Sequence, residues 1–249
     1  MIIIKNDKEI DLMRIAGRIV AETLLLVEKE VRPGITTAEL DRIAEEFITK
    51  HGAKPSFKGL YGFPASLCIS VNEQVVHGIP GSYRLQEGDI VSVDCGANIN
   101  GFHGDAARTF AVGNISEEAK RLIKVTEESF FKGLEFAKVG NKLTDISHEI
   151  QRYVEVSGFS VVREFVGHGI GKSVHEDPEV PNFGRPGRGP KLVAGMALAI
   201  EPMVNMGTYR VATLGDDWTV VSADKSLSAH YENTVVILPD GPEILTLIK

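Results

Sequence analysis

The chain has 249 residues, of which 43% are hydrophobic, and its formal net charge is -7. This length and composition can bury a full core as one large domain or as two fused halves. The acidic balance and the lack of a nucleic-acid-binding motif argue against broad nucleic-acid binding, and no apolar run approaches the roughly 20 residues of a membrane span.

Two helices are predicted at the start of the chain. Charged residues follow the apolar residues 1–4 at once, so no signal peptide is expected and the protein is expected in the cytoplasm. Asn6-x-x-Glu9 and Thr36-x-x-Glu39 are capping boxes, each followed by apolar residues at helical spacing. Pro33-Gly34 and Gly52 end the two patterns. The two cysteines, Cys68 and Cys95, form no CxxC pair and predict neither a disulfide framework nor a zinc ribbon.

A strand is predicted from Cys68 to Val76, leading into a loop that presents His77, and a β-hairpin is predicted around Asn100-Gly101. If residue 99 pairs with 102, residue 96 pairs with 105, and the alternation of side chains makes Asp94 and Asp105 diagonal neighbours on one face. Such neighbours lie roughly 7 to 8 Å apart, a gap that a divalent ion can bridge. The alternative is a solvated face carrying two unrelated acids.

The second half of the chain repeats the pattern of the first. A helix is predicted from Ser116 to about Ala137, and then Gly140 and Gly158 follow Gly34 and Gly52 at an offset of 106 residues. The segment 194–201 matches 87–94 at an offset of 107, which makes Glu201 the equivalent of Asp94. Recurrence of common caps and terminal glycines is the alternative, but the shared offset favours an internal duplication of about 7–112 and 117–238 within one catalytic domain, 1–249.

Two further segments carry candidate ligands. Glycines surround His168 in the segment 167–171, and they indicate close approach of the backbone rather than nucleotide binding, because no Walker lysine follows and no dinucleotide-type βαβ unit surrounds them. Glu232 lies in an otherwise apolar predicted strand, 229–238, where a carboxylate requires a cation or a hydrogen-bond partner. Four carboxylates and one imidazole suit divalent manganese, iron, cobalt or zinc, and the ligand types do not choose among them.

In this order and spacing, these residues resemble the type I methionine aminopeptidases in their short bacterial form, which belong to peptidase family M24. The resemblance covers essentially the whole chain. It is carried by Cys68-Ile69-Ser70-Val71-Asn72-Glu73 with His77-Gly78-Ile79-Pro80, by Gly88-Asp89-Ile90-Val91-x-x-Asp94 and Gly101-Phe102-His103-Gly104-Asp105, and by Gly167-His168-Gly169-Ile170-Gly171 with His175-Glu176, Ile200-Glu201-Pro202-Met203 and Glu232.

The resemblance implies a pita-bread fold, an α/β architecture in which two pseudo-two-fold related halves surround a central antiparallel sheet flanked by helices. It also implies two divalent metal ions per chain. Asp94 would chelate one ion, Asp105 and Glu232 would bridge both, and His168 and Glu201 would bind the other. A bridging metal hydroxide would then attack the scissile carbonyl, with Glu201 moving the proton toward the leaving amine.

The implied activity is removal of the initiator methionine from nascent proteins after deformylation, when the second residue is Gly, Ala, Ser, Thr, Cys, Pro or Val. His77 and His175 would contact the substrate and assist catalysis, and Phe63, Cys68 and Trp218 would form the methionine pocket. Phe57, Leu60 and Val174 match that pocket less well. A monomer that acts near the ribosome after peptide deformylase, with no membrane association, is expected.

This chain departs from the family pattern at three positions. Tyr61 stands where many relatives carry histidine, Val174 where some carry an aromatic residue, and Asn233 where histidine usually follows the last ligand. Two alternatives remain: an X-Pro type peptidase, although the residues before Asp7 leave no room for its extra amino-terminal domain, and a non-catalytic binding protein with the same fold, against which the intact ligand set argues.

Overall fold

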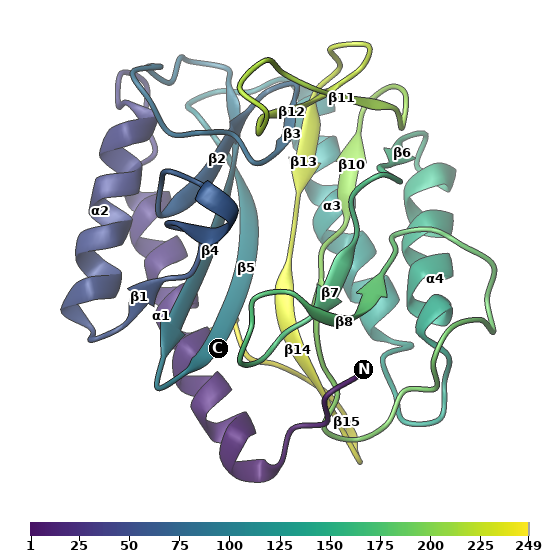
Figure 1. The fold of residues 1–249 in the computed structure, drawn as a ribbon. Helices are drawn as coiled ribbons and strands as arrows, with labels where there is room; N and C mark the ends of the chain where they lie inside the picture. The colour runs from purple at the N-terminus through teal and green to yellow at the C-terminus, as the bar shows by residue number, and fades with distance from the viewer. Residues whose placement is uncertain (249) are drawn as a thin grey trace.

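Two units of helices and strands stand side by side in the computed structural model, which describes residues 1–248, so only the last residue of the predicted 1–249 domain lies outside it (Figure 1). The first unit contains α1 (Asp7–Glu30), α2 (Thr37–Lys50), β1 (Lys54–Pro55), a 3-10 turn (Leu60–Gly62), β2 (Leu67–Val71), β3 (Gln74–Val76), β4 (Ile90–Ile99) and β5 (Phe102–Ala111). The second contains α3 (Glu117–Leu134), α4 (Leu143–Val156), β6 (Ser160–Val161), β7 (Gly167–Gly169), β8 (Glu176–Val180), β9 (Ala197–Ile200), β10 (Met203–Asn205), β11 (Val211–Thr213), β12 (Val220–Ser222), β13 (Ser228–His230), β14 (Asn233–Leu238) and β15 (Gly241–Ile244).

The helices begin where the capping boxes predict. The Asn6 side chain accepts the backbone N–H of Glu9 at 3.1 Å, and Thr36 accepts that of Glu39 at 3.2 Å. Each bond satisfies a backbone donor that the first helical turn leaves free. Helices α1 and α2 pack on each other and against the β4–β5 sheet, whereas α3 and α4 pack on each other and against strands of the second unit. Each unit therefore buries an apolar helix face on its own strands.

The predicted hairpin is confirmed in register. Ile99 pairs with Phe102 and Gly96 with Asp105, and the two turn residues, Asn100 and Gly101, have φ values of 55° and 80°. Both positive φ values are those that a two-residue type I′ turn requires. Asp94 pairs with Ala107, two positions along from the Gly96 pair, so Asp94 and Asp105 lie diagonally on one face, as predicted.

The two units meet along β5, which runs beside β13 and β14 at the centre of the molecule (Figure 1). The N–H of Glu232 donates to the carbonyl of Ala107 at 3.0 Å, and the N–H of Ala107 donates back at 3.3 Å. Two residues further along each segment, the N–H of Asp105 donates to the hydroxyl of Thr234 at 2.9 Å. The seam between the units therefore passes directly through two of the predicted metal ligands.

Two predicted strands are wrong in extent. The segment from Cys68 to Val76 is two strands, because Asn72 adopts a left-handed φ of 55° in a tight turn between β2 and β3. The predicted strand 229–238 is also interrupted: β13 pairs with β10, whereas β14 pairs with β9 and β15. Glu232 lies in the break where the chain changes partners, rather than inside a continuous strand.

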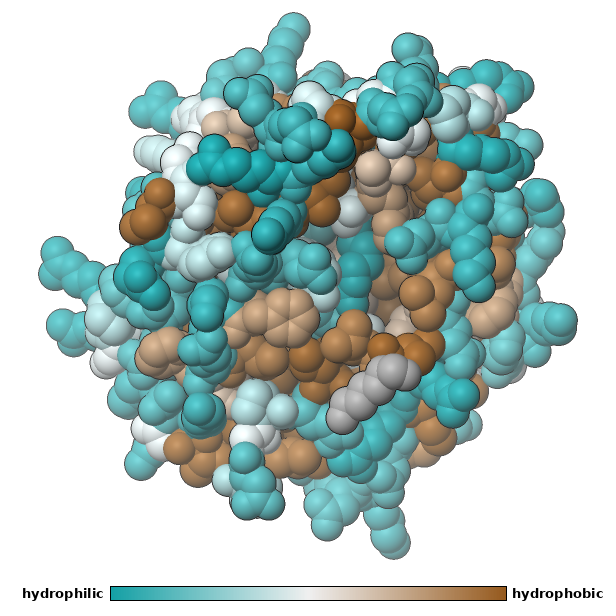
Figure 2. Space-filling model, turned by 180° about the vertical axis from the view of Figure 1, so that it is seen from behind, coloured by the Kyte–Doolittle hydropathy of each residue, from teal (hydrophilic) through white to brown (hydrophobic). Residues whose placement is uncertain are grey.

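The bounds of two helices repeat at the offset found in the sequence, whereas the duplication itself stays a prediction. Helices α2 and α4 have 14 residues each, and both their first residues, 37 and 143, and their last residues, 50 and 156, are 106 apart. Within residues 1–248, no helix is both long and apolar enough to cross a membrane. On the rear face, apolar side chains gather near the centre of a largely hydrophilic surface (Figure 2).

Candidate metal centre and substrate cavity

The five predicted metal ligands come together on one cavity of about 490 Å³. Strands β4 and β5 carry the two aspartates, and β7 carries the histidine. Glu201 directly follows β9, and Glu232 directly precedes β14. The strands of both units thus supply the centre, and residues more than a hundred positions apart in sequence share it. The residues are Asp94, Asp105, His168, Glu201 and Glu232.

Several oxygen atoms of this cluster are buried without a hydrogen-bond partner. They are one carboxylate oxygen each of Asp94, Asp105 and Glu232. Burying an unpaired carboxylate is costly unless a cation or a proton compensates it. Ligand atoms of Asp105, His168 and Glu232 lie within 4.8 Å of one another, as do those of Glu201, His230 and Glu232. These donor types and the unpartnered oxygens fit divalent cations, with Glu232 common to both groups.

The protonation of the cluster reflects its burial. Burial raises the pKa of Asp94 to about 7 and raises the pKa of Glu201 well above its usual range. For Asp105, burial and then the Asp94 carboxylate raise the pKa, and for Glu232 burial and then Asp105 do so. Without a cation, these carboxyl groups therefore hold their protons more tightly than free carboxyl groups do, and metal binding must release any proton that they hold.

His168 is oriented as a metal ligand would be. Its Nδ1 lies 2.9 Å from the carbonyl of Gly169, which can only accept, so Nδ1 carries the proton and the Nε2 lone pair is free. Nε2 lies 3.5 Å from a carboxylate oxygen of Glu201. The neighbouring glycines are explained by close packing: a Cβ at Gly167 would collide with the carbonyl of Ala199, and one at Gly169 with that of Asp177. The predicted close backbone approach beside His168 is confirmed.

His230 is a residue of this centre that the sequence analysis missed. It is only 2% exposed, and its Nε2 has no hydrogen bond, although it lies 3.6 Å from Glu201 Oε2 and 3.9 Å from Glu232 Oε2. Burial lowers its pKa to about 4, so the ring is neutral at pH 7. A signal was available, because side chains two positions apart in an extended segment share a side, and His230 precedes Glu232 by two.

His77 and His175 lie on the same cavity. The ring of His77, whose backbone has a left-handed φ of 60°, lies edge-on to Phe165 and Trp218 with centroids 5.5 and 6.4 Å away. The ring of His175 lies edge-on to His168 at 4.5 Å. Burial lowers the pKa of His77 to about 4 and also lowers that of His175. Neutral imidazoles in these positions can donate a hydrogen bond without adding charge to the centre.

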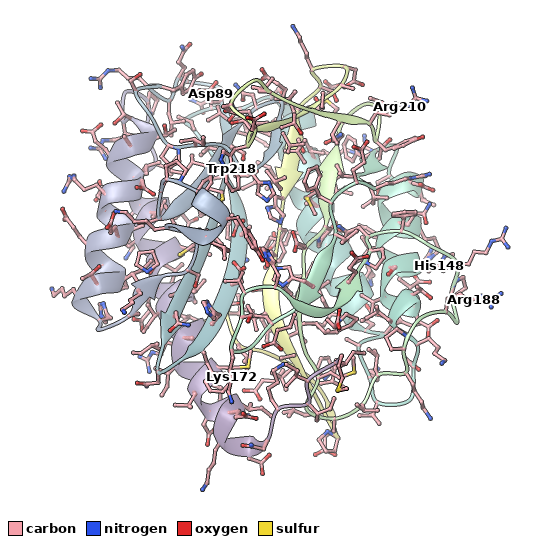
Figure 3. The ribbon with its side chains drawn as sticks, in the orientation of Figure 1. Asp89, His148, Lys172, Arg188, Arg210 and Trp218 are labelled. Atoms are coloured by element: carbon pink, nitrogen blue, oxygen red, sulfur yellow. The ribbon has the colours of Figure 1, made fainter. Side chains whose placement is uncertain are left out.

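Apolar side chains close the other end of the cavity. Phe63 and Trp218 meet at a centroid distance of 5.1 Å and an interplanar angle of 71°, and Cys68 lies with them. In Figure 3, the labelled Trp218 lies in the upper half of the molecule, on the side of the first unit, where it packs with Phe63 and Leu60. Phe57 and Leu60 also line the cavity, whereas Val174 packs in the same apolar cluster behind it.

Tyr61, one of the departures from the family pattern, stands at the mouth of this cavity. Its side chain is 75% exposed, and its ring is stacked on that of His175 at 5.8 Å and 5°. A left-handed backbone, with φ of 51°, holds it there. The sequence analysis did not expect this contact, because a stacking partner in a loop has no periodicity that would mark it.

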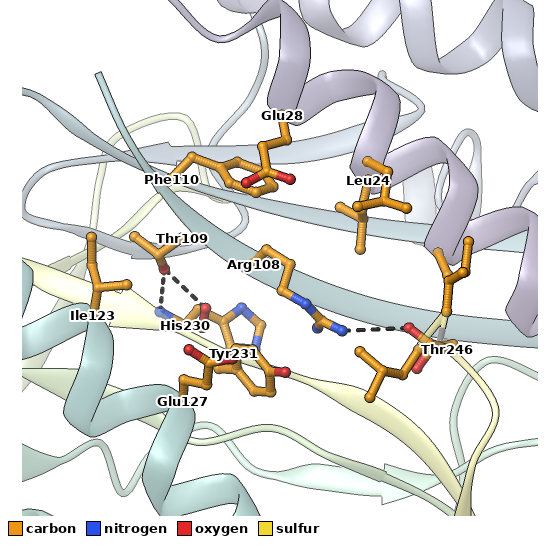
Figure 4. Close-up of a pocket in the computed structure, with 14 residues that line it drawn as sticks. Leu24, Glu28, Arg108, Thr109, Phe110, Ile123, Glu127, His230, Tyr231 and Thr246 are labelled. Atoms are coloured by element: carbon orange, nitrogen blue, oxygen red, sulfur yellow. Dashed lines mark hydrogen bonds between the residues drawn. The ribbon is translucent and has the colours of Figure 1, made fainter. Parts of the chain in front are cut away.

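Arg108 fixes the backbone of Glu232. Its Nη1 donates to the carbonyl of Glu232 at 2.5 Å and its Nη2 to Oδ1 of Asn233 at 2.7 Å, while the guanidinium covers the ring of Tyr231 at 4.3 Å. Arg108 and Tyr231 line a second cavity of about 260 Å³, together with Thr246 and His230 (Figure 4). Asn233, another departure from the family pattern, is thus anchored by Arg108 and by the hydroxyl of Thr246 at 3.0 Å.

Comparison with known proteins agrees with this geometry. The model of metallopeptidase family M24 matches residues 11–239. A curated methionine aminopeptidase of Clostridium perfringens is 79% identical, with 100% of both chains covered. The chain belongs to the methionine aminopeptidases of family M24. It is therefore a metallopeptidase and an aminopeptidase, and the predicted family is confirmed.

Solved structures confirm the pita-bread fold. The crystal structure of methionine aminopeptidase from Thermotoga maritima superposes with a TM-score of 0.98 at 47% identity, with 100% of both chains covered. The prolidase of Pyrococcus furiosus reaches a TM-score of 0.82 at 24% identity, and 66% of that chain is covered. The prolidase therefore shares the fold, while the sequence of this chain is much more similar to the methionine aminopeptidases.

Proposed function

We propose that this methionine aminopeptidase removes the initiator methionine from nascent chains whose second residue is small. One observation carries the proposal: a single cavity joins the carboxylate cluster to an apolar slot lined by Phe63, Cys68 and Trp218. Such a slot suits the flexible, polarisable thioether of methionine. The scissile bond would then lie over the carboxylates, with the second side chain close to them.

The donor set supports two divalent ions. Glu232 belongs to both groups of candidate ligands, and Asp105 lies diagonally across the hairpin from Asp94, which supports Asp105 and Glu232 as shared ligands, Asp94 as the ligand of one ion, and His168 and Glu201 as ligands of the other. Ions bound there would acidify a water and polarise the scissile carbonyl. Oxygen-rich ligation with imidazole nitrogen suits manganese, iron, cobalt or zinc.

The other steps belong to side chains of this chain. Glu201, whose pKa burial raises, can hold a proton and pass it to the leaving amine. His175 would donate to the carbonyl oxygen as negative charge develops on it, and His77 to the nitrogen that follows. Both rings lie on the cavity wall, and their lowered pKa values keep them neutral donors at pH 7.

The same geometry supports selectivity for a free amino terminus and a small second residue. A β-branched or bulky second side chain would displace the scissile bond, and a displacement of even about 1 Å can lower a rate roughly a hundredfold. A formyl group on the methionine would occupy space beside the carboxylates, so action after peptide deformylase, on chains leaving the ribosome, is consistent with the site.

A peptide series tests the proposal. Protein freed of metal is loaded with manganese or cobalt and assayed on Met-Xaa-Ser, with Xaa as Gly, Ala, Ser, Val, Leu and Ile. Fast methionine release is expected for the small three, intermediate release for Val, and release at least about a hundredfold slower for Leu and Ile. Equal turnover across the series would contradict selection by size at the second position.

Two further outcomes would identify the alternatives. Cleavage of Ala-Pro peptides in preference to Met-Ala-Ser would identify an X-Pro type peptidase, and metal binding without any cleavage would identify a binding protein. Elemental analysis of protein purified without added metal, with and without exclusion of air, would identify the ion that the cell supplies.

A further inference from the structure

The segment that precedes α1 lies against the loop that carries His175, which connects β7 to β8 (Figure 1). Lys5 holds it there. Its backbone N–H donates to the carbonyl of Gly195 at 2.8 Å, and its ammonium lies 2.5 Å from Glu176 Oε2 and 2.9 Å from the carbonyl of Ile3. The Lys5 and Glu176 side chains are only 2% and 6% exposed, so the ion pair is shielded from water.

The second oxygen of Glu176 organises the loop itself. Oε1 accepts the backbone N–H groups of Lys172 at 2.8 Å and Ser173 at 3.3 Å. A single carboxylate therefore ties the loop backbone to Lys5, and His175 is its immediate neighbour in sequence. Backbone donors bound by a carboxylate form strong, charge-assisted hydrogen bonds, so the shape of this loop depends on Glu176 remaining in place.

Two glycines mark how closely Lys5 is packed. A Cβ at Gly171 would lie 2.5 Å from Lys5 Cε and 2.7 Å from Glu176 Oε1. A Cβ at Gly195, where φ is +86°, would lie 2.5 Å from the carbonyl of Lys5. No other residue type fits at either position without displacing Lys5. Gly171, which ends the 167–171 segment, thus leaves room for the side chain of Lys5 from the start of the chain.

We propose that Lys5 is a positioning residue for His175. Its ammonium compensates the charge of the buried Glu176 carboxylate. That carboxylate holds the loop in the conformation that directs the His175 imidazole into the cavity. Removing one partner of a buried pair leaves an uncompensated charge, which the loop can relieve only by moving or by taking up a proton. The role of His175 is taken from the proposed function, whereas the anchoring of the loop stands on the contacts alone.

A double-mutant comparison of Lys5 and His175 tests the proposal. Lys5→Met keeps the length of the side chain without its charge, and we expect kcat for Met-Ala-Ser to fall about tenfold to a hundredfold, with KM changing much less. In a His175→Ala background, Lys5→Met should lower kcat by less than about twofold, because residues that act through one group do not add. A fall by the same factor in both backgrounds would overturn the proposal.

The chain offers a matched control and a rescue. Lys172 lies on the same loop, but its side chain is 69% exposed and pairs with Glu9 at 3.4 Å, so Lys172→Met should change kcat by less than about twofold. In Lys5→Met with Glu176→Gln, no unpaired charge remains and the amide oxygen can still accept the two N–H groups. Its kcat should recover to within about threefold of the wild type. If this variant were no more active than Lys5→Met, charge compensation would not be the cause.

A readout without catalysis separates this inference from the proposed function. Hydrogen exchange at the amides of Lys172 and Ser173 should be about tenfold faster in Lys5→Met than in the wild type, whether or not either protein cleaves peptides. Unchanged exchange would overturn the inference even if the peptide series succeeded. Should Lys5→Met not fold, Glu176→Gln alone serves the same test, with the same expected non-additivity with His175→Ala.

Discussion

The two units of the molecule hold their candidate metal ligands in different ways. In the first unit, Asp94 and Asp105 lie on one continuous hairpin of two ten-residue strands, and the turn at residues 100–101 fixes their relative register. In the second unit, His168 lies on a strand of three residues, and Glu201 and Glu232 lie just beyond strand ends. Local pairing fixes the first set, whereas contacts between distant segments fix the second.

The difference indicates where the centre is robust and where it depends on support. The hairpin retains its geometry as long as its ladder of hydrogen bonds persists. Glu232, in contrast, depends on the seam with Ala107 and on the guanidinium of Arg108, and the orientation of His168 depends on the carbonyl of Gly169. Substitutions in the two units can separate loss of a ligand from loss of its support.

Removal of a ligand from either unit should have the largest effect. Asp105→Asn and Glu232→Gln each remove a candidate shared ligand, and we expect methionine release to fall by at least about a thousandfold, since polarisation by bound metal contributes several kcal/mol. Both variants should fold, because each also relieves repulsion between buried carboxylates. An active, metal-replete variant at either position would contradict the assignment, and far-UV circular dichroism is the control for folding.

Substitution of a histidine on the cavity wall should have a smaller effect. His175→Ala should lower kcat about 100- to 1,000-fold with little change in KM, because a contact to developing negative charge strengthens only in the transition state. His77→Ala should act in the same direction. Steady-state kinetics on Met-Ala-Ser measures both. If KM rose with kcat unchanged, the histidine would be a binding residue rather than a catalytic one.

The unpartnered imidazole in the second unit tests whether support matters there. His230→Phe keeps the volume but removes Nε2 beside Glu201 and Glu232, and it should weaken metal affinity about 10- to 100-fold, the range found for groups that orient ligands. Competition with a chelator measures the affinity. His51→Phe, an exposed histidine on the C-terminal end of α2, is the control and should leave the affinity unchanged.

The smallest expected effect is on stability as a function of pH. Burial raises the pKa of Asp94 to about 7 and raises those of Asp105, Glu201 and Glu232, so these carboxyl groups bind more protons in the metal-free native state than in the unfolded state above about pH 4. The buried imidazoles of His77, His168 and His230, whose pKa values burial lowers to about 4, act in the opposite direction. The contribution of Asp94 is therefore measured against Asp94→Asn: as pH rises from about 4 to 7, the Tm of the metal-free wild type should fall relative to that of the variant by about 5 °C. Metal-loaded protein should show the opposite slope, because its ligands must be deprotonated. A metal-free profile that is unchanged in Asp94→Asn would contradict the shift at Asp94.

The sequence predicts the site well in the first unit and less well in the second. The hairpin was predictable to the residue, because Asn100-Gly101 specifies the turn and alternation specifies the face. The break at Glu232 was not, because an apolar run gives no sign of where a strand changes partners. Arg108 and Lys5 were missed for a related reason: each acts on a segment far away in sequence, and only the three-dimensional contact reveals the partner.

The seam through Asp105 and Glu232 also bears on the conformational entropy of the unfolded chain. An ion held jointly by Asp94 and Glu232 would be a reversible cross-link between positions 94 and 232, and would close a loop of more than half the chain. The entropy of closing a loop grows only slowly with its length, so a cross-link over so long a loop restricts the unfolded chain about as strongly as a single contact can. Binding of the ion would then raise the stability of the whole protein as well as enable its chemistry. Loss of the ion would first weaken the attachment of one unit to the other.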